Sequence, residues 1–232
     1  IWSAGGRLIM NLKAILFDFE GTLVDFQWDL AGAVSATLDL LRESGFPLER
    51  LKSRKYSTLM QEAIALAAEI GYPPEKVRER IGDIYDRFDE DALTRWTLQP
   101  GVKTFFHLLP TEGIKAGLVS NVGKKNLEKA LQKLGLLGCF NVVISRNDVK
   151  CLKPSGEGLT LALHRLQVLK DNALHVGDSL DDILAAKEAG VKVIAIQGGE
   201  NRKKELLSAG PDRCIRHFSE LSACLATLFS RS

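Results

Sequence analysis

The sequence predicts an α/β fold, in which a doubly wound parallel sheet carries an inserted all-helical cap. Two observations support this prediction. Short apolar runs alternate with amphipathic helical stretches, and the runs are nearly continuous in apolar character, as expected for strands covered on both faces. One long segment interrupts the alternation, because it holds helical patterns and no convincing strand. A chain of 232 residues is long enough for one domain with a substantial insertion.

Six segments have the length and composition of strands. Their positions are 12–19, 114–121, 140–145, 173–178, 191–197 and 213–218. Helical patterns lie between them, for example in "GKKNLEKALQKLG" (123–135) and "SGEGLTLALHRLQV" (155–168). Strands that alternate with helices in this way are typical of a parallel sheet.

The interrupting segment, residues 26–98, is the predicted cap. Its stretch 58–71 places one apolar stripe on Leu59, Ala63, Leu66, Ala67 and Ile70, and its stretch 73–88 places another on Val77, Ile81, Ile84, Tyr85 and Phe88. The segment is too long for an ordinary loop. We therefore assign residues 10–25 and 99–232 to the α/β core, and we interpret residues 1–9 as a non-native or disordered extension before Met10.

Composition limits the function and the location. A formal charge of +2, from 31 basic and 29 acidic residues, gives no overall attraction to nucleic acid or to an anionic membrane. No apolar run approaches the ~18 residues that a membrane span needs, and the first ten residues lack the order of a secretory signal. We therefore expect a cytoplasmic protein with no nucleic-acid or membrane partner.

The four cysteines show no CxxC pair and no metal-ligand spacing with the four histidines; they are Cys139, Cys151, Cys214 and Cys224. We interpret them as buried small hydrophobic residues or incidental thiols in a reducing compartment.

Polar side chains gather at the carboxyl ends of the predicted strands. They are Asp18, Glu20 and Thr22 after the first strand, Ser120 and Asn121 after the second, Lys153 after the third, and Asp178 and Asp182 after the fourth. In open α/β sheets, ligands bind outside the carboxyl ends of the strands, where the strand order reverses. We therefore predict one shared site, although each motif alone is also compatible with a turn, a solvated lysine or a helix-terminal charge.

The acidic members of this set favour phosphoryl transfer. Asp18, on rigid strand backbone, can act as a covalent nucleophile. Asp178 and Asp182 offer hard oxygen ligands, and Mg²⁺ is the cation that best compensates several carboxylates in one crevice. Asp182 could instead be a charge at a helix N-terminus, and its neighbour Asp181 is interpreted as a helix-capping or solvated residue.

The remaining members can bind a phosphoryl group. Ser120, Asn121 and the backbone N–H groups near Gly123 can hold phosphate oxygens, and Lys153 can neutralise both the phosphate and the nucleophile. Thr22 joins this set by its position, and the alternative that it only hydrogen-bonds the turn stays open. The same alternative, a flexible turn, stays open for Gly123.

Taken in order, these motifs resemble those of the haloacid dehalogenase superfamily of hydrolases, namely DxDx[TV], a Ser or Thr, a Lys and GDxxxD. The matching residues are Asp18-Phe-Glu20-Gly-Thr22, Ser120, Lys153 and Gly177-Asp178-Ser-Leu-Asp-Asp182. The segments 100–121 and 175–190 resemble the phosphoglycolate-phosphatase-like branch. The resemblance implies a Rossmann-like core, an aspartyl-phosphate on Asp18, and Mg²⁺ among Asp18, residue 20, Asp178 and Asp182. It also implies that Ser120 and Lys153 grip the phosphoryl group and that the cap closes over the site.

Glu20 departs from the superfamily pattern, which has aspartate at this position. The two acids have similar reference pKa values, ~3.9 and ~4.3, so the acid–base chemistry survives the change. The extra methylene moves the carboxyl group, and a misplacement of ~1 Å can cost ~10²-fold in rate. Either the loop is adjusted so that Glu20 works as the acid and base, or dephosphorylation is slowed.

The sequence therefore predicts a Mg²⁺-dependent phosphatase, a monomer or homodimer, that acts on a small phosphorylated metabolite of the phosphoglycolate or sugar-phosphate type. Two alternatives stay open. One is a phosphomutase or phosphotransferase on the same scaffold. The other is a weakly active phosphate-binding protein, for which Glu20 is the indication.

Overall fold

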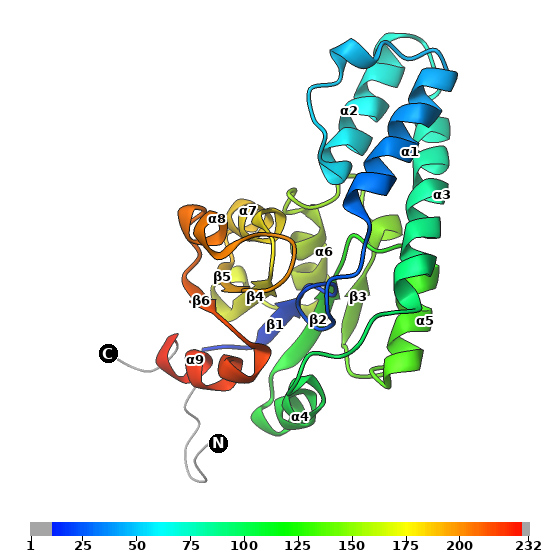
Figure 1. Cartoon of the computed structure of the whole chain (residues 1–232). Coiled ribbons are helices and arrows are strands. Elements are labelled where there is room, and N and C mark those ends of the chain that lie inside the picture. Colours follow the sequence, from blue (N-terminus) through cyan, green and yellow to red (C-terminus); the bar gives the residue numbers. More distant parts are fainter. Residues whose placement is uncertain (1–10, 229–232) are drawn as a thin grey trace.

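The structure, a computed structural model, describes residues 11–228, and its six strands form one sheet in the order β3-β2-β1-β4-β5-β6 (Figure 1). The strands are β1 (Ala14–Phe17), β2 (Lys115–Val119), β3 (Val142–Ile144), β4 (Ala173–Gly177), β5 (Lys192–Ile196) and β6 (Arg213–Ile215). All neighbouring strands are parallel. The six predicted strands are confirmed, although each is shorter than its predicted segment and β1, β3 and β6 have half the predicted length. The predicted extension at residues 1–9 lies outside the described residues.

The strand order reverses between β1 and β4. The chain proceeds outward from β1 through β2 to β3 on one side, and from β4 through β5 to β6 on the other. A doubly wound sheet binds its ligands beyond the carboxyl ends of the two strands at such a reversal. The residues that follow β1 and β4 are therefore placed at the predicted site.

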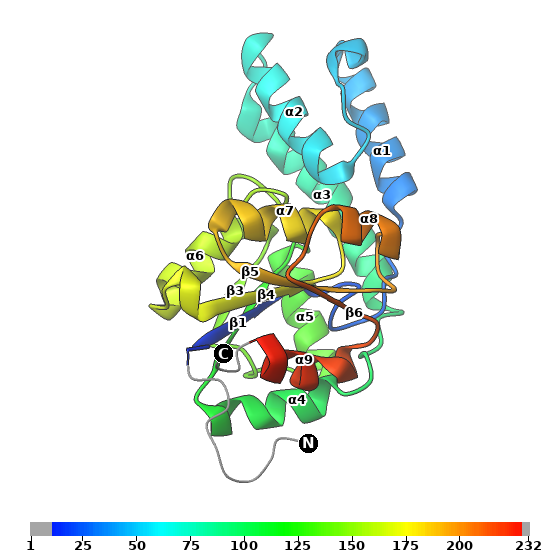
Figure 2. The same ribbon diagram turned by 90° about the vertical axis from the view of Figure 1, so that its left-hand side faces the viewer.

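Helices cover both faces of the sheet, with α4 (Val102–Leu108), α5 (Lys124–Leu134) and α9 (Leu221–Leu228) on one face and α6 (Glu157–Leu166), α7 (Leu180–Ala189) and α8 (Lys203–Ser208) on the other (Figure 2). Along β1, Ile15 and Phe17 join the first core cluster, while Ala14 and Leu16 join the second. Because alternate side chains are buried on opposite faces, the strand is continuously apolar. Short 3₁₀ helices occupy Leu48–Arg50, Leu109–Glu112, Arg146–Asp148, Lys170–Asn172 and Phe218–Glu220.

The cap consists of α1 (Leu30–Glu43), α2 (Tyr56–Glu69) and α3 (Pro74–Leu93), which project beyond the sheet in Figure 1 while α3 continues alongside α5. The predicted stripes are buried or half-buried in the cap, with one exception. Ile70 is 40% exposed, because α2 ends at Glu69 and Gly71, with φ +75°, turns the chain away from the stripe. The exact boundaries of the cap at residues 26 and 98 stay a prediction.

Two further expectations concern composition. No helix among residues 11–228 combines the length and the apolar character that crossing a membrane requires. The four cysteines are free and only half-buried. Their expected full burial is wrong, although Cys139, Cys214 and Cys224 pack against the two core clusters. Their interpretation as incidental thiols stays a prediction.

Candidate active site

The strand ends deliver the predicted groups to one edge of the sheet. Asp18 follows β1 and its N–H donates to Val176 O across 2.9 Å, while Ser120 follows β2 and donates to Ile144 O across 2.9 Å. Each residue extends the hydrogen-bonded ladder by one position, so its backbone is fixed like that of the strand. Asp178 follows β4, on the other side of the reversal in strand order.

Lys153 lies between two carboxylates. Its Nζ contacts Asp18 Oδ1 and lies 2.6 Å from Asp182 Oδ1, and all three side chains are buried. Burial lowers the pKa of Lys153, but the two carboxylates outweigh burial and hold the pKa above its ordinary value. Burial raises the pKa of Asp18 to about 6, although Lys153 opposes the shift. The lysine therefore stays charged and fixes the position of the Asp18 carboxylate.

Asp182 uses both of its carboxylate oxygens within the protein. Oδ1 accepts from Lys153 and lies 3.0 Å from His175 Nε2, while Oδ2 accepts from the N–H (3.1 Å) and the hydroxyl (2.6 Å) of Ser179. Ser179 is the N-cap of α7, so the two residues form a capping box. Burial raises the pKa of Asp182, but Lys153 and His175 outweigh burial and lower it overall. Asp182 is thus both a helix cap and a site carboxylate, and its role as a metal ligand stays a prediction.

Asp178 receives its hydrogen bonds from neutral donors. Thr22 Oγ1 donates to Oδ1 across 3.2 Å, and Glu200 N–H donates to Oδ2 across 2.7 Å. Two glycines make room for the carboxylate, because a Cβ on Gly21 would lie 2.3 Å, and a Cβ on Gly199 only 1.9 Å, from Asp178 Oδ2. Burial and the neighbouring carboxylates raise the pKa of Asp178 well above its ordinary value.

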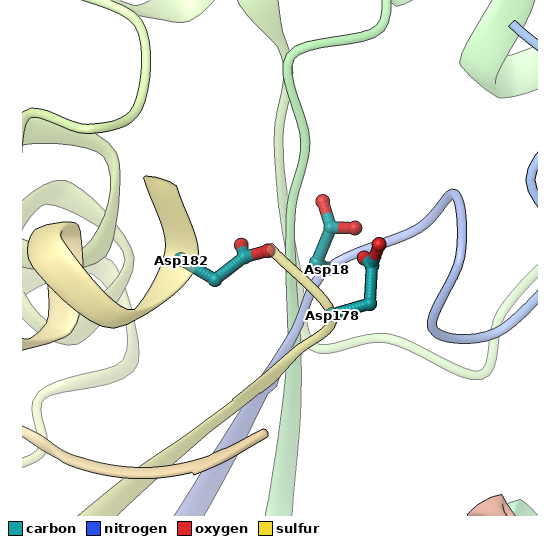
Figure 3. Close-up of side chains that lie close together, drawn as sticks. All are labelled: Asp18, Asp178 and Asp182. Atoms are coloured by element: carbon teal, nitrogen blue, oxygen red, sulfur yellow. The ribbon is translucent and has the colours of Figure 1, made fainter. Parts of the chain in front are cut away.

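Three buried carboxylates converge at this edge. Oxygens of Asp18, Asp178 and Asp182 lie within 4.8 Å of one another, and their side chains approach from the ends of β1 and β4 and from α7 (Figure 3). Lys153 offsets the charge of two of them, whereas Asp178 has the two neutral donors. The excess negative charge in a buried site favours a divalent cation, and oxygen ligands of this kind suit Mg²⁺. The residues present therefore fit the predicted metal.

Glu20 contacts both chain segments that connect the core to the cap. Its Oε1 accepts from the N–H groups of Gln27 and Trp28, each across 2.7 Å, and from Trp96 Nε1 across 2.8 Å. Gln27 and Trp28 precede α1, while Trp96 follows α3. Burial raises the pKa of Glu20 to about 7, although these three donors oppose the shift. The longer side chain thus reaches both linkers, which the sequence did not indicate.

Two of the predicted phosphate-binding residues line the cleft above the three carboxylates. Ser120 is buried there, and its Oγ accepts from Val122 N–H across 3.2 Å. Asn121 Oδ1 accepts from Lys153 N–H across 3.1 Å. Asn121 therefore positions the backbone of the lysine in addition to facing the cleft.

Thr22 and Gly123, the other two residues predicted to bind phosphate, lie outside the lining of the cleft. Thr22 is fully buried against Asp178. Gly123 N–H donates to Asp89 Oδ2 of α3 across 2.8 Å, and a Cβ on this glycine would lie 2.1 Å from Asp86 Oδ1. In this arrangement the glycine permits the close approach of cap and core, and its contact with phosphate stays a prediction.

The start of α2 closes the cleft, which encloses about 40 Å³. Tyr56 Oη accepts from Asn121 Nδ2 across 3.0 Å, Ser57 Oγ donates to Asp181 Oδ2 across 2.9 Å, and Lys55 Nζ lies 2.7 Å from Asp181 Oδ1. We call Lys55, Tyr56 and Ser57 the roof. The interpretation of Asp181 as a capping or solvated residue is wrong, because Asp181 is buried against the roof. No local pattern marks these contacts, whose partners are distant in the sequence.

A second contact between cap and core involves Asp89 of α3. Its carboxylate accepts from Trp28 Nε1 across 2.9 Å, from Gly123 N–H across 2.8 Å and from Arg146 Nη2 across 2.8 Å. Burial raises the pKa of Asp89, while Arg146 opposes the shift. Sequence reasoning missed this residue, because an acid on a helix is usually solvated.

Comparisons with known proteins identify the family of the chain. The haloacid dehalogenase-like hydrolase family profile matches residues 15–196. A phosphoglycolate phosphatase from Salmonella choleraesuis is 30% identical over 237 aligned positions, which cover 94% of each chain. A hydrolase from Pseudomonas syringae superposes with a TM-score of 0.68 at 21% identity, covering 94% of this chain and 100% of that one. A candidate beta-phosphoglucomutase from Thermotoga maritima gives a TM-score of 0.61 at 22% identity, with 94% and 100% covered.

The fold is a Rossmann-like core with a helical cap, and the family profile identifies its class as a hydrolase. The chain belongs to the haloacid dehalogenase-like hydrolase family, within its phosphoglycolate-phosphatase-like branch, and it is an enzyme of the phosphatase type.

Proposed function

We propose that this enzyme is a Mg²⁺-dependent phosphatase that hydrolyses a small phosphorylated metabolite through an aspartyl-phosphate on Asp18. The observation that carries the proposal is the buried contact of Lys153 with Asp18 and Asp182, beside Asp178. This arrangement holds a carboxylate on rigid backbone next to a cation and a candidate metal site. Curated relatives named phosphoglycolate phosphatase make phosphoglycolate one candidate substrate, and a sugar phosphate is another.

The proposed reaction has two steps. An oxygen of Asp18 attacks phosphorus, the bond from phosphorus to the leaving oxygen breaks, and Glu20 gives its proton to that oxygen. Water then attacks the phosphorus, Glu20 takes a proton from the water, and the bond between Asp18 and phosphorus breaks to release phosphate. A pKa of about 7 suits Glu20 to both proton transfers.

The other groups stabilise the phosphoryl oxygens. Lys153, Ser120 and the side chain of Asn121 are placed to hold them at the cleft. Mg²⁺ would be held by Asp18, Asp178 and the backbone carbonyl of residue 20, and when bound it would neutralise charge that develops on the phosphoryl group.

A second candidate function is phosphoryl transfer to an acceptor other than water, as in a phosphomutase. The small cleft favours it, because few water molecules fit beside an aspartyl-phosphate there. Such an enzyme would convert a sugar phosphate to its isomer without releasing phosphate. A weakly active protein, the third possibility, would bind Mg²⁺ and phosphate and show neither outcome.

Phosphate release from a panel of phosphorylated metabolites, with Mg²⁺ and with EDTA, tests the proposal. We expect turnover that requires Mg²⁺ and that falls at least ~10³-fold in Asp18→Asn, because loss of a covalent nucleophile removes the pathway itself. Thermal unfolding of Asp18→Asn serves as the control for folding. Turnover retained in this variant would exclude Asp18 as the nucleophile, and intact-mass detection of a phosphorylated wild-type chain would identify the intermediate.

A further inference from the structure

A large groove adjoins the small cleft. The cleft encloses about 40 Å³, which is room for a phosphoryl group or a few water molecules but not for a long leaving group. The neighbouring groove measures about 760 Å³. Leu30, Tyr56 and Glu200 line both spaces, so the two adjoin at these residues. In Figure 2 the segment that leads into α2 descends beside α1 toward the loop that precedes α8, which carries Glu200.

The groove is mainly apolar. One face of α1 supplies Leu30, Val34 and Leu38, which follow the i, i+4 spacing of a helix stripe and stay half-buried rather than covered. The opposite wall is the segment from Ser53 to Tyr56. Covering a half-exposed apolar stripe of this kind with an apolar group lowers the free energy, because apolar surface is removed from water.

Charge at the junction disfavours an anionic leaving group. Among the described residues that line the cleft, Lys153 is the only cation, and it is already paired with two carboxylates. Lys55, at the junction with the groove, lies 2.7 Å from Asp181 Oδ1 and 3.7 Å from Glu200 Oε1. Lys55 is therefore matched by carboxylates, and a further carboxylate at the junction would meet Glu200. Arg54, which also lines the groove, is exposed and donates to the carbonyl oxygens of Leu51 and Ser53, so a carboxylate farther along the groove would meet a cation.

We propose that this groove receives the leaving group, and that the preferred substrates are phosphate monoesters whose leaving group is apolar beyond its first atoms and carries no negative charge at the junction with the cleft. The inference rests on the proposed phosphatase function and specifies its substrate class. This substrate preference would differ from that of the curated relatives named phosphoglycolate phosphatase, because the leaving group of phosphoglycolate carries a carboxylate.

Two series of esters test the inference. Methyl, propyl and hexyl phosphate have leaving groups of similar basicity, so differences in kcat/KM between them report contacts beyond the reacting bond. Phosphoglycolate and the ω-carboxylated analogues of propyl and hexyl phosphate add a negative charge. Because the groove is open on one side, we expect kcat/KM to rise about twofold per methylene, or roughly 30-fold from methyl to hexyl. We expect phosphoglycolate, whose carboxylate lies at the junction, to fall about tenfold or more below methyl phosphate. The two longer carboxylated esters should fall less below their alkyl counterparts, because their carboxylates extend along the groove that Arg54 lines.

Variants on α1 locate the effect. Val34→Asp and the milder Leu38→Gln should reduce the hexyl-to-methyl ratio of kcat/KM to about fivefold or less, because they place a polar group in the groove. Ala36→Asp adds the same charge to a different face of α1, outside the groove, and should leave the ratio unchanged. A ratio of two substrates is independent of the fraction of folded enzyme.

Each outcome decides the matter. A rise along the alkyl series that Val34→Asp or Leu38→Gln flattens supports the inference. A flat alkyl series, or phosphoglycolate as the best ester, overturns the inference and leaves the proposed phosphatase intact. If Mg²⁺ supports no turnover of any ester, methyl phosphate included, the proposed function itself fails and the inference fails with it.

Discussion

The acidic edge of the sheet and the roof of the cleft are built in different ways. The acidic edge comprises Asp18, Asp178, Asp182 and Lys153. Its three carboxylates stand on strand ends and on a capped helix within the core, and Lys153 lies in the loop between β3 and α6. Among the described residues, the roof reaches the core through side-chain contacts such as that of Ser57 with Asp181. If the cap moves, a site on rigid backbone should keep its geometry, whereas the contacts of the roof should break. The comparison therefore assigns chemistry to the edge and access to the roof.

Glu20 is the residue that most directly challenges this division, because it follows β1 and yet bonds to both linkers of the cap. If it is the general acid, Glu20→Gln should lower kcat/KM for an alkyl phosphate by about 10²-fold or more. The acid must be protonated to act. Since burial raises the pKa of Glu20 to about 7, wild-type kcat/KM should fall roughly tenfold per pH unit above that value. A pH–rate profile checks both expectations.

The control for Glu20 is the leaving group itself. 4-Nitrophenyl phosphate has a leaving group that departs without a proton, so Glu20→Gln should slow its phosphorylation step far less than that of an alkyl ester. A burst of nitrophenolate measures that step. An equal loss with both esters, or an unchanged alkaline limb in Glu20→Gln, would assign Glu20 to positioning of the linkers instead of proton transfer.

Thr22 tests the role of the acidic edge, because it supports Asp178 through a hydrogen bond without facing the cleft. Thr22→Val keeps the shape of the side chain and removes the hydrogen bond to Asp178. Loss of such a partner to a metal ligand costs about 10- to 100-fold in metal affinity, so we expect the Mg²⁺ concentration for half-maximal rate to rise by at least tenfold. Titration of the rate with Mg²⁺ provides the measurement.

Thr37→Val is the matched control, because Thr37 is equally buried and its hydroxyl donates to Ala33 O within α1 of the cap. Both variants should lose similar stability, and only Thr22→Val should change the Mg²⁺ requirement. The same requirement in all three proteins would contradict the expectation that the Thr22 hydrogen bond supports a metal ligand at Asp178.

Sequence reasoning succeeded where neighbours in the chain determine the structure. The parallel sheet followed from apolar runs that alternate with helices, and the convergence of Asp18, Ser120, Lys153 and Asp178 followed from the geometry of strand ends. The stripe on α2 failed only at Ile70, where the helix ends one residue earlier than the pattern suggests. These features depend on local periodicity and on the rule that ligand sites lie beyond the carboxyl ends of parallel strands.

Sequence patterns do not predict the contacts whose partners are far apart in the sequence. Asp181 was interpreted as a cap or a solvated residue, because nothing near it indicates Ser57, which is 124 positions away. Likewise, Glu20 was recognised as unusual, but its contact with Trp96 depends on how the two linkers meet. The placement of α2 over the sheet edge creates these contacts, and single-sequence patterns carry no information about that placement.

The smallest effect that we predict concerns the roof. Ser57→Ala removes one hydrogen bond between cap and core while Lys55 remains on Asp181. The loss of about 1 kcal/mol from the closed form should raise KM about three- to fivefold and leave kcat nearly unchanged, since the bound substrate still closes the cap. Ser44→Ala is the matched control, because the bonds of Ser44 to Leu40 O and Arg80 stay within the cap. Steady-state kinetics of the two variants separate cap closure from cap stability. A fall in kcat of ~10²-fold in Ser57→Ala would contradict the division between edge and roof, because it would place the roof in the chemical step.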